Sequence, residues 1–319
     1  RRFLLGTPPS AATLNPLPMS PRPLHAARRL RRAALALVLS TATVPGDLPA
    51  AAAGKTVVSA APWVESEFPF FSSILDARKA GVGMPADNLA PRGQVLNLGH
   101  DCWACFDPDL LRMTMIWRGA GVTPTALAPG SYHDIARKTP GGQTNLPRPD
   151  GRPWIGTGIY PGGNEGETLF LTDPRSPAPS PQEPGRGALP GEAGRFRAVR
   201  ITERNAVLEY TLGRTAISEW LAVAGEATAP EIRRNFEVGA SPQTLRIVLG
   251  TKAPGTLVSI GLPADASTDA VRLLEERGVA SLLLAPRVRP LRFTVALNHG
   301  SAVPASAQGG EAPPSARAR

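Results

Sequence analysis

The chain lacks the common motifs that carry catalytic or cofactor chemistry. It contains no Gly-x-Ser-x-Gly nucleophile turn, no His-Glu-x-x-His zinc site and no phosphate-binding loop, and Gly156-Thr157-Gly158 lacks the third glycine of a dinucleotide fingerprint. Its longest apolar run is far shorter than the ~20 residues that span a bilayer, so we expect no retained membrane helix. These absences remove several enzyme classes from consideration.

A basic patch interleaved with aromatic side chains is also missing, although the net charge is +9. Seven arginines lie in residues 1–53 beside a single acid, Asp47, which leaves only +3 for residues 54–319. A domain with so small a charge and no basic patch binds nucleic acid poorly. We therefore expect no nucleic-acid partner.

The basic N-terminal segment has the three parts of an export signal. Arg28–Arg32 is charged, Ala33–Leu39 is apolar, and Ala50–Ala53 supplies small residues for cleavage. The alternative is a basic amphipathic helix of the fold. The order of the three parts favours a leader over residues 1–53, with translation starting at Met19, and predicts a periplasmic or extracellular protein.

Glycine and proline are abundant, with 32 and 35 residues, which favours short elements joined by turns. Residues 94–98, 103–106 and 110–117 read as strands, with Asp107-Pro108-Asp109 as a hairpin turn. A Pro-rich loop follows at 173–194. Beyond it, strand patterns recur roughly every ten residues, as in antiparallel sandwiches: 196–201, 206–212, 215–223, 232–238, 244–249, 256–260, 281–284 and 291–297.

A single helix is expected over Thr268–Arg277, with Ser267 or Thr268 as its N-cap and Gly278 as its stop. The prediction is therefore one mainly β domain over residues 56–300, an antiparallel sandwich or supersandwich with long loops and one short helix. The small, Pro-rich residues 301–319 resemble a linker, as expected of a protein that continues past Arg319.

Cys102 and Cys105 form a Cys-x-x-Cys pair within an expected strand. Covalent haem attachment requires His after the second cysteine, and Phe106 stands there instead. Because residues i and i+3 of a strand point to opposite faces, two buried apolar thiols fit best. A structural disulfide and redox or metal chemistry remain as alternatives.

Other polar side chains form no recognised site. His100, Asp101 and His133 join the cysteines as zinc-like ligand types, but the paired spacing of zinc sites is absent, so we expect no metal. Four glutamates on the late strands could contain a glycosidase-like pair, although solubilising surface charge explains them more simply: Glu203, Glu209, Glu219 and Glu237.

Several segments together carry a family resemblance. They include Leu89–Gly99, Cys105-Phe106-Asp107, Trp117-Arg118-Gly119, Ser131-Tyr132-His133-Asp134 and Gly158–Gly162. Over residues 63–300 the chain resembles an uncharacterised N-terminal domain of large exported bacterial proteins, whose longer members end in a c-type cytochrome domain. The resemblance implies export and a redox partner domain. Haem c would belong to that further domain, since this chain has no Cys-x-x-Cys-His.

Two functions follow from these observations. The first is a non-catalytic module that binds a small molecule or glycan, or docks on a redox domain. Its candidate binding residues are the polar and aromatic side chains expected on loops: Ser131, Tyr132, His133, Asp134, Trp154 and Tyr160. The second is a carbohydrate-active enzyme on a β-supersandwich, with His133 and either Glu209 or Asp134 as acid and base.

Overall fold

The computed structural model describes residues 69–123, 146–176, 186–202 and 205–300, all within the compact unit Lys55–Arg319. The expected leader and the tail 301–319 lie outside these ranges. Within them, no helix has the length and hydropathy of a membrane span. The regular elements of the described residues are all strands: β1 (Phe70–Asp76), β2 (Leu89–Gly99), β3 (Cys102–Asp107), β4 (Arg112–Val122), β5 (Pro149–Gly156), β6 (Gly163–Glu165), β7 (Gly194–Ile201), β8 (Ala206–Leu212), β9 (Thr215–Glu226), β10 (Ala229–Val238), β11 (Leu245–Lys252), β12 (Thr256–Gly261), β13 (Val271–Glu276), β14 (Val279–Leu284) and β15 (Leu291–His299).

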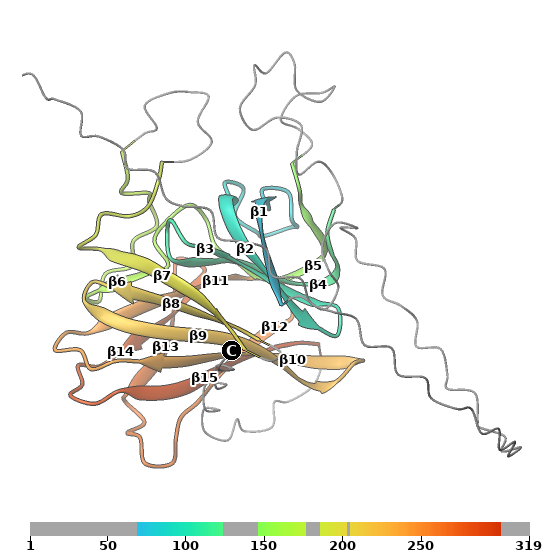
Figure 1. The fold of residues 1–319 in the computed structure, drawn as a ribbon. Coiled ribbons are helices and arrows are strands. Elements are labelled where there is room, and N and C mark those ends of the chain that lie inside the picture. Colours follow the sequence, from blue (N-terminus) through green and yellow to red (C-terminus); the bar gives the residue numbers. More distant parts are fainter. Residues whose placement is uncertain (1–68, 124–145, 177–185, 203–204, 301–319) are drawn as a thin grey trace, which may run out of the picture. The chain divides into compact units, whose positions relative to one another are not determined.

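The strands pair into two sheets, and each pairing is antiparallel (Figure 1). The nine-stranded sheet has the order β1-β2-β3-β4-β5-β11-β14-β13, with β6 beside β11. The six-stranded sheet has the order β12-β15-β10-β9-β8-β7. The two sheets pack face to face, which confirms the expected antiparallel sandwich.

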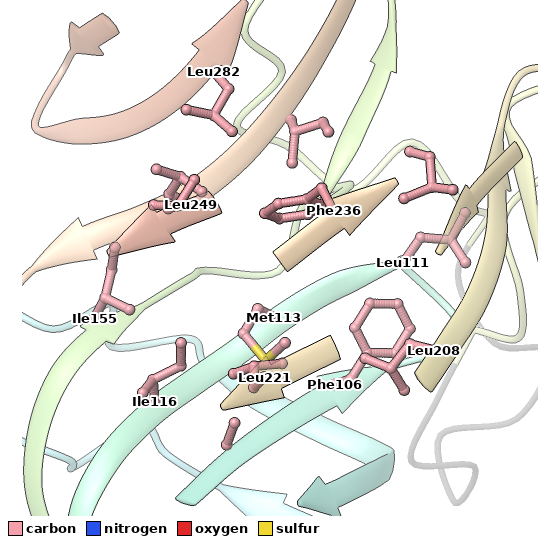
Figure 2. Close-up of a cluster of buried hydrophobic side chains, with 14 of the residues drawn as sticks. Phe106, Leu111, Met113, Ile116, Ile155, Leu208, Leu221, Phe236, Leu249 and Leu282 are labelled. Atoms are coloured by element: carbon pink, nitrogen blue, oxygen red, sulfur yellow. The ribbon is translucent and has the colours of Figure 1, made fainter. Parts of the chain in front are cut away.

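Alternating side chains place one face of each sheet in a shared core, because successive residues of a strand point to opposite faces. Both sheets contribute to this core (Figure 2): Phe106, Met113, Ile155, Leu249 and Leu282 from the nine-stranded sheet and Leu208, Leu221 and Phe236 from the six-stranded sheet. The rings of Phe236 and Phe293 stack 5.0 Å apart. Full burial of such a side chain contributes about 1.5–3 kcal/mol, so this core is the main source of stability.

A smaller apolar cluster lies on the other face of the nine-stranded sheet. Trp103 on β3 is the cross-strand partner of Trp117 on β4, and their rings stack with centroids 6.5 Å apart. Each indole N–H donates to a backbone carbonyl, Trp103 to Gly119 and Trp117 to Gly121. Both tryptophans are thus buried with their polar atoms satisfied.

The expected helix over Thr268–Arg277 is wrong, and the described residues contain no helix. Val271–Glu276 is instead strand β13, paired with β14 so that Glu276 lies opposite Val279. The two residues between them, Arg277 and Gly278, have φ angles of 50° and 75°. Two consecutive positive φ angles make a type I′ hairpin turn, so Gly278 closes a hairpin rather than a helix.

Replacing Gly278 with alanine should lower the free energy of unfolding by about 1–2 kcal/mol, the cost of a left-handed residue with a Cβ. No atom lies within 4 Å of a Cβ added there, so the loss comes from the backbone alone. Gly278→Asn should lower the free energy of unfolding by less than Gly278→Ala does, because asparagine tolerates this conformation. Urea unfolding of both variants measures the difference, and an equal loss for the two would contradict the turn assignment.

Candidate functional site

The predicted binding residues fall into two groups. Ser131, Tyr132, His133 and Asp134 lie outside the described residues. Trp154 lies within β5 rather than on a loop, is 2% exposed, and stacks on the ring of His299 at 5.8 Å. Tyr160 follows β5 and is 6% exposed.

The structure does not bring Trp154 and Tyr160 together. Trp154 belongs to the core between the sheets, whereas Tyr160 packs with Leu169 and Val248 in a separate apolar cluster. Burial raises the pKa of the Tyr160 hydroxyl. Little of either ring surface is open to a ligand, and binding at these residues stays a prediction.

Cys102 and Cys105 are free and buried on opposite faces of β3. Cys102 contributes to the core between the sheets, and Cys105 to the cluster around the stacked tryptophans. Burial raises the pKa of the Cys102 thiol to about 11 and that of the Cys105 thiol further still. The geometry therefore matches two packed thiols, without a disulfide between them.

Neither thiol should react with a disulfide reagent at pH 8 in the folded protein, because the reactive thiolate is scarcely populated. In denaturant, both should react. A colorimetric thiol assay in native and denaturing buffer measures this. Fast native labelling would contradict the burial, and fewer than two thiols in denaturant would indicate a disulfide.

The acids on the late strands have separate roles. Glu203 lies outside the described residues. Glu209 pairs with Arg200 at 2.8 Å, and Glu237 pairs with Arg292 at 3.1 Å. The expectation of surface charge is therefore consistent with Glu209 and Glu237 but wrong for Glu219.

Glu219 is fully buried between the sheets. One of its oxygens accepts a hydrogen bond from the Tyr210 hydroxyl at 3.0 Å, and the other accepts from Nε of Arg234 at 2.8 Å. Burial and the neighbouring carboxylate of Glu219 raise the pKa of Tyr210 well above its ordinary value. Both carboxylate oxygens are thus bound within the fold, as expected of a structural acid.

No metal site is present in the described parts of the chain, where no three His, Cys, Asp or Glu side chains come together as ligands. His100 and Asp101 instead form the β2–β3 turn, with φ angles of 51° and 58°. Paired positive φ angles again define a tight hairpin turn. His133, the other histidine considered as a zinc-type ligand, lies outside the described residues.

A cavity of about 1160 Å³ lies among the loops at one end of the described domain. Three connections line it, residues 241–242 after β10, 263–270 between β12 and β13, and 285–290 between β14 and β15. The pairings Val238–Leu291 and Gly261–Thr294 bring the ends of β10 and β12 beside the start of β15. The cavity therefore lies where loops gather at one end of the six-stranded sheet, a usual place for binding sites.

Backbone hydrogen bonds hold these connections. Ser241 and Arg287 form a two-way bridge, N–H to carbonyl, of 2.9 and 2.7 Å. The amide of Ala285 donates to the carbonyl of Ala270 at 3.1 Å. Pro286 and Pro290 flank the arginine-bearing part of the last connection and restrict its backbone. The cavity wall is thus anchored on both sides.

Arg287 is the unusual charged group of this cavity. Its Nη2 donates to the carbonyl of Ala285 at 2.9 Å, while its buried Nη1 has no partner among the described residues. Burial lowers the pKa of this guanidinium. A buried N–H group without an acceptor is costly, and native proteins rarely leave one.

A smaller cleft of about 460 Å³ lies between residues 87–91, 159, 171–175 and 186. Three of its charged groups, Asp173, Arg175 and Arg186, pair with one another. Asp173 pairs with Arg175 at 2.9 Å and with Arg186 at 3.5 Å. Burial opposes ionisation of Asp173, but the hydrogen bonds from Arg175 outweigh it and lower the pKa of the carboxyl. This cleft is therefore the weaker candidate for a binding site.

The sequence interpretation did not single out the cavity residues. The run Pro286-Arg287-Val288-Arg289-Pro290 between two strand patterns was an available signal, because a rigid loop with two arginines presents charge at a fixed position. What the run does not reveal is which other connections lie next to it. That depends on the pairing of β15 with both β10 and β12.

These features define an antiparallel β-sandwich domain with a cavity among its end loops. Residues 104–219 match the model of a family described as a domain of unknown function, DUF6797. The match runs from β3 to β9 and contains the buried Arg112 and Glu219, whereas the cavity residues follow it in sequence. No curated protein and no solved structure matched the chain.

Proposed function

We propose that this domain is a non-catalytic, exported ligand-binding module, and that its ligand occupies the cavity between the end loops. The observation that carries the proposal is a cavity of about 1160 Å³ among the end loops, with Arg287 and Arg289 in its lining. This volume lies just above the roughly 300–1,000 Å³ usual for ligand pockets. The candidate acids Glu209 and Glu237 are paired with arginines, and Glu219 is committed to the core, so none of them supports an enzymatic role.

The setting of the module is part of the proposal. The leader-like segment supports export, and the family resemblance supports a c-type cytochrome domain elsewhere in the same protein, with haem bound there. Expression of the gene in a bacterial host, followed by N-terminal sequencing of the exported product, tests the leader. Retention of Arg28–Arg32 in the mature protein would contradict export by this signal.

Ligand binding is tested by thermal shift of the purified protein against a panel of neutral sugars, sugar acids, amino acids and dicarboxylates. A ligand that binds only the folded state raises the melting temperature. The raised melting temperature should disappear in Val288→Trp, which places a large side chain on an exposed position of the cavity wall. A panel without any stabilising compound, or a hit unaffected by Val288→Trp, would overturn this assignment of the site.

A further inference from the structure

The charged groups of the cavity are only partly paired. Glu237 and Arg292 neutralise each other at 3.1 Å. Four charged side chains remain in the lining with no ion pair to described residues: Arg287, Arg289, Asp265 and Asp269. The two acids come from the β12–β13 connection and the two arginines from the β14–β15 connection. The cavity therefore offers both hydrogen-bond donors with positive charge and acceptors with negative charge.

Each of these groups selects a different feature of a ligand. A guanidinium binds a carboxylate best, through two parallel N–H groups, and the cavity lining contains two guanidinium groups, Arg287 and Arg289. Ionised aspartates only accept hydrogen bonds, so Asp265 and Asp269 require donors such as hydroxyl groups. Pro242, Pro263 and Leu291 add apolar surface to the lining. The matching ligand has a carboxylate, several hydroxyls and apolar C–H faces.

We infer, as a refinement that rests on the proposed function, that the cavity binds a sugar acid, with its carboxylate on Arg287 and its hydroxyl groups on Asp265 and Asp269. The cavity has room for more than one sugar ring, so an oligomer of uronic acid fits better than a monomer.

The test is isothermal titration with trigalacturonate, its methyl ester and neutral maltotriose. The acid should bind at least about 10-fold more tightly than either neutral compound, as expected for one charge-assisted hydrogen bond. The ester is the matched control, because it keeps the sugar rings and hydroxyl groups, loses the charge that Arg287 would recognise, and adds only one methyl group to each carboxyl. This comparison uses the wild-type protein and holds even if a variant fails to fold.

Protein variants give a second readout. Arg287→Met should weaken binding of the acid by roughly 10- to 100-fold. Arg272→Met, an exposed arginine of β13 outside the cavity lining, should leave binding unchanged. Equal affinity for acid and ester, or full affinity in Arg287→Met, would overturn the sugar-acid inference while leaving a ligand site in place. If none of the three sugars binds, the inference fails, and the thermal-shift panel then decides separately whether the module binds any ligand.

Discussion

Glu219→Ala is expected to lower the free energy of unfolding by about 3–5 kcal/mol, the usual loss when one partner of a buried ion pair is removed. The change would leave the guanidinium of Arg234, 2% exposed, without its counter-charge between the sheets. It would also remove the acceptor of the Tyr210 hydroxyl. Arg234 stays over the ring of Phe236, 5.2 Å from its centroid, which compensates only in part. Urea unfolding measures the loss.

Glu209→Ala is the matched control for this prediction. Glu209 is a glutamate on the neighbouring strand β8, paired with Arg200, but both side chains are about one-third exposed. Exposed pairs contribute about 0–1 kcal/mol, so the control should change little. The double variant Glu219→Leu with Arg234→Met should recover most of the loss, since neither charge then remains buried. A cost for Glu219→Ala as small as that of Glu209→Ala would refute the buried pair.

Arg112→Met should be comparably destabilising, by about 3–5 kcal/mol, because it leaves the carboxylate of Asp107 buried without its counter-charge. The guanidinium is fully buried at the start of β4, and its Nε donates to Asp107 at 3.1 Å. Nη2 donates to the carbonyl of Leu89 at 2.8 Å, and Nη1 donates to the carbonyls of Thr157 and Gly158. The Arg112 side chain thereby links the end of the β1–β2 connection, where β2 begins, and the start of the β5–β6 connection to the nine-stranded sheet.

Arg92→Met provides the comparison for Arg112. Arg92 also pairs with an aspartate of the β3–β4 turn, Asp109, but 60% of its side chain is exposed. Because Asp109 is only 8% exposed, the loss of stability should exceed the ~0–1 kcal/mol of a fully exposed pair, but it should stay below that of Arg112→Met. Limited proteolysis adds a local readout, since Arg112→Met should expose residues 86–91 and 157–159 to cleavage while Arg92→Met should not. Equal stability of the two variants would contradict the role of Arg112.

The strand pattern beyond the Pro-rich loop predicted most of the six-stranded sheet, and β8 has the predicted bounds. Side-chain alternation sets these strands directly, so it can be read without knowing their neighbours. The β13 hairpin was missed because Val271 and Leu274 also have helical spacing, and only pairing with β14 decides between the two. β5 was missed because its first half is rich in proline and glycine, and β4 and β11 hold it on both sides.

Side-chain alternation along the strands was also sufficient to predict the buried charges Glu219 and Arg234. Glu219 lies two residues from both Ile217 and Leu221, and Arg234 lies two residues from both Ile232 and Phe236. Each charge therefore shares the apolar face of its strand. Two opposite charges on the core faces of sequential strands predict a buried pair. The cavity could not be predicted from side-chain alternation. Its lining comes from three connections, whose proximity depends on strand order rather than on any local motif.

The most direct test of the central claim, that a sugar acid binds among the end loops, is a heteronuclear NMR titration of the wild-type domain with trigalacturonate. The account predicts saturable shifts of amide signals in residues 237–242, 263–270 and 285–292, with the β1–β4 region unchanged. Saturable shifts that instead centre on the β1–β4 region or on the cleft around Asp173, or the absence of any shift, would contradict it.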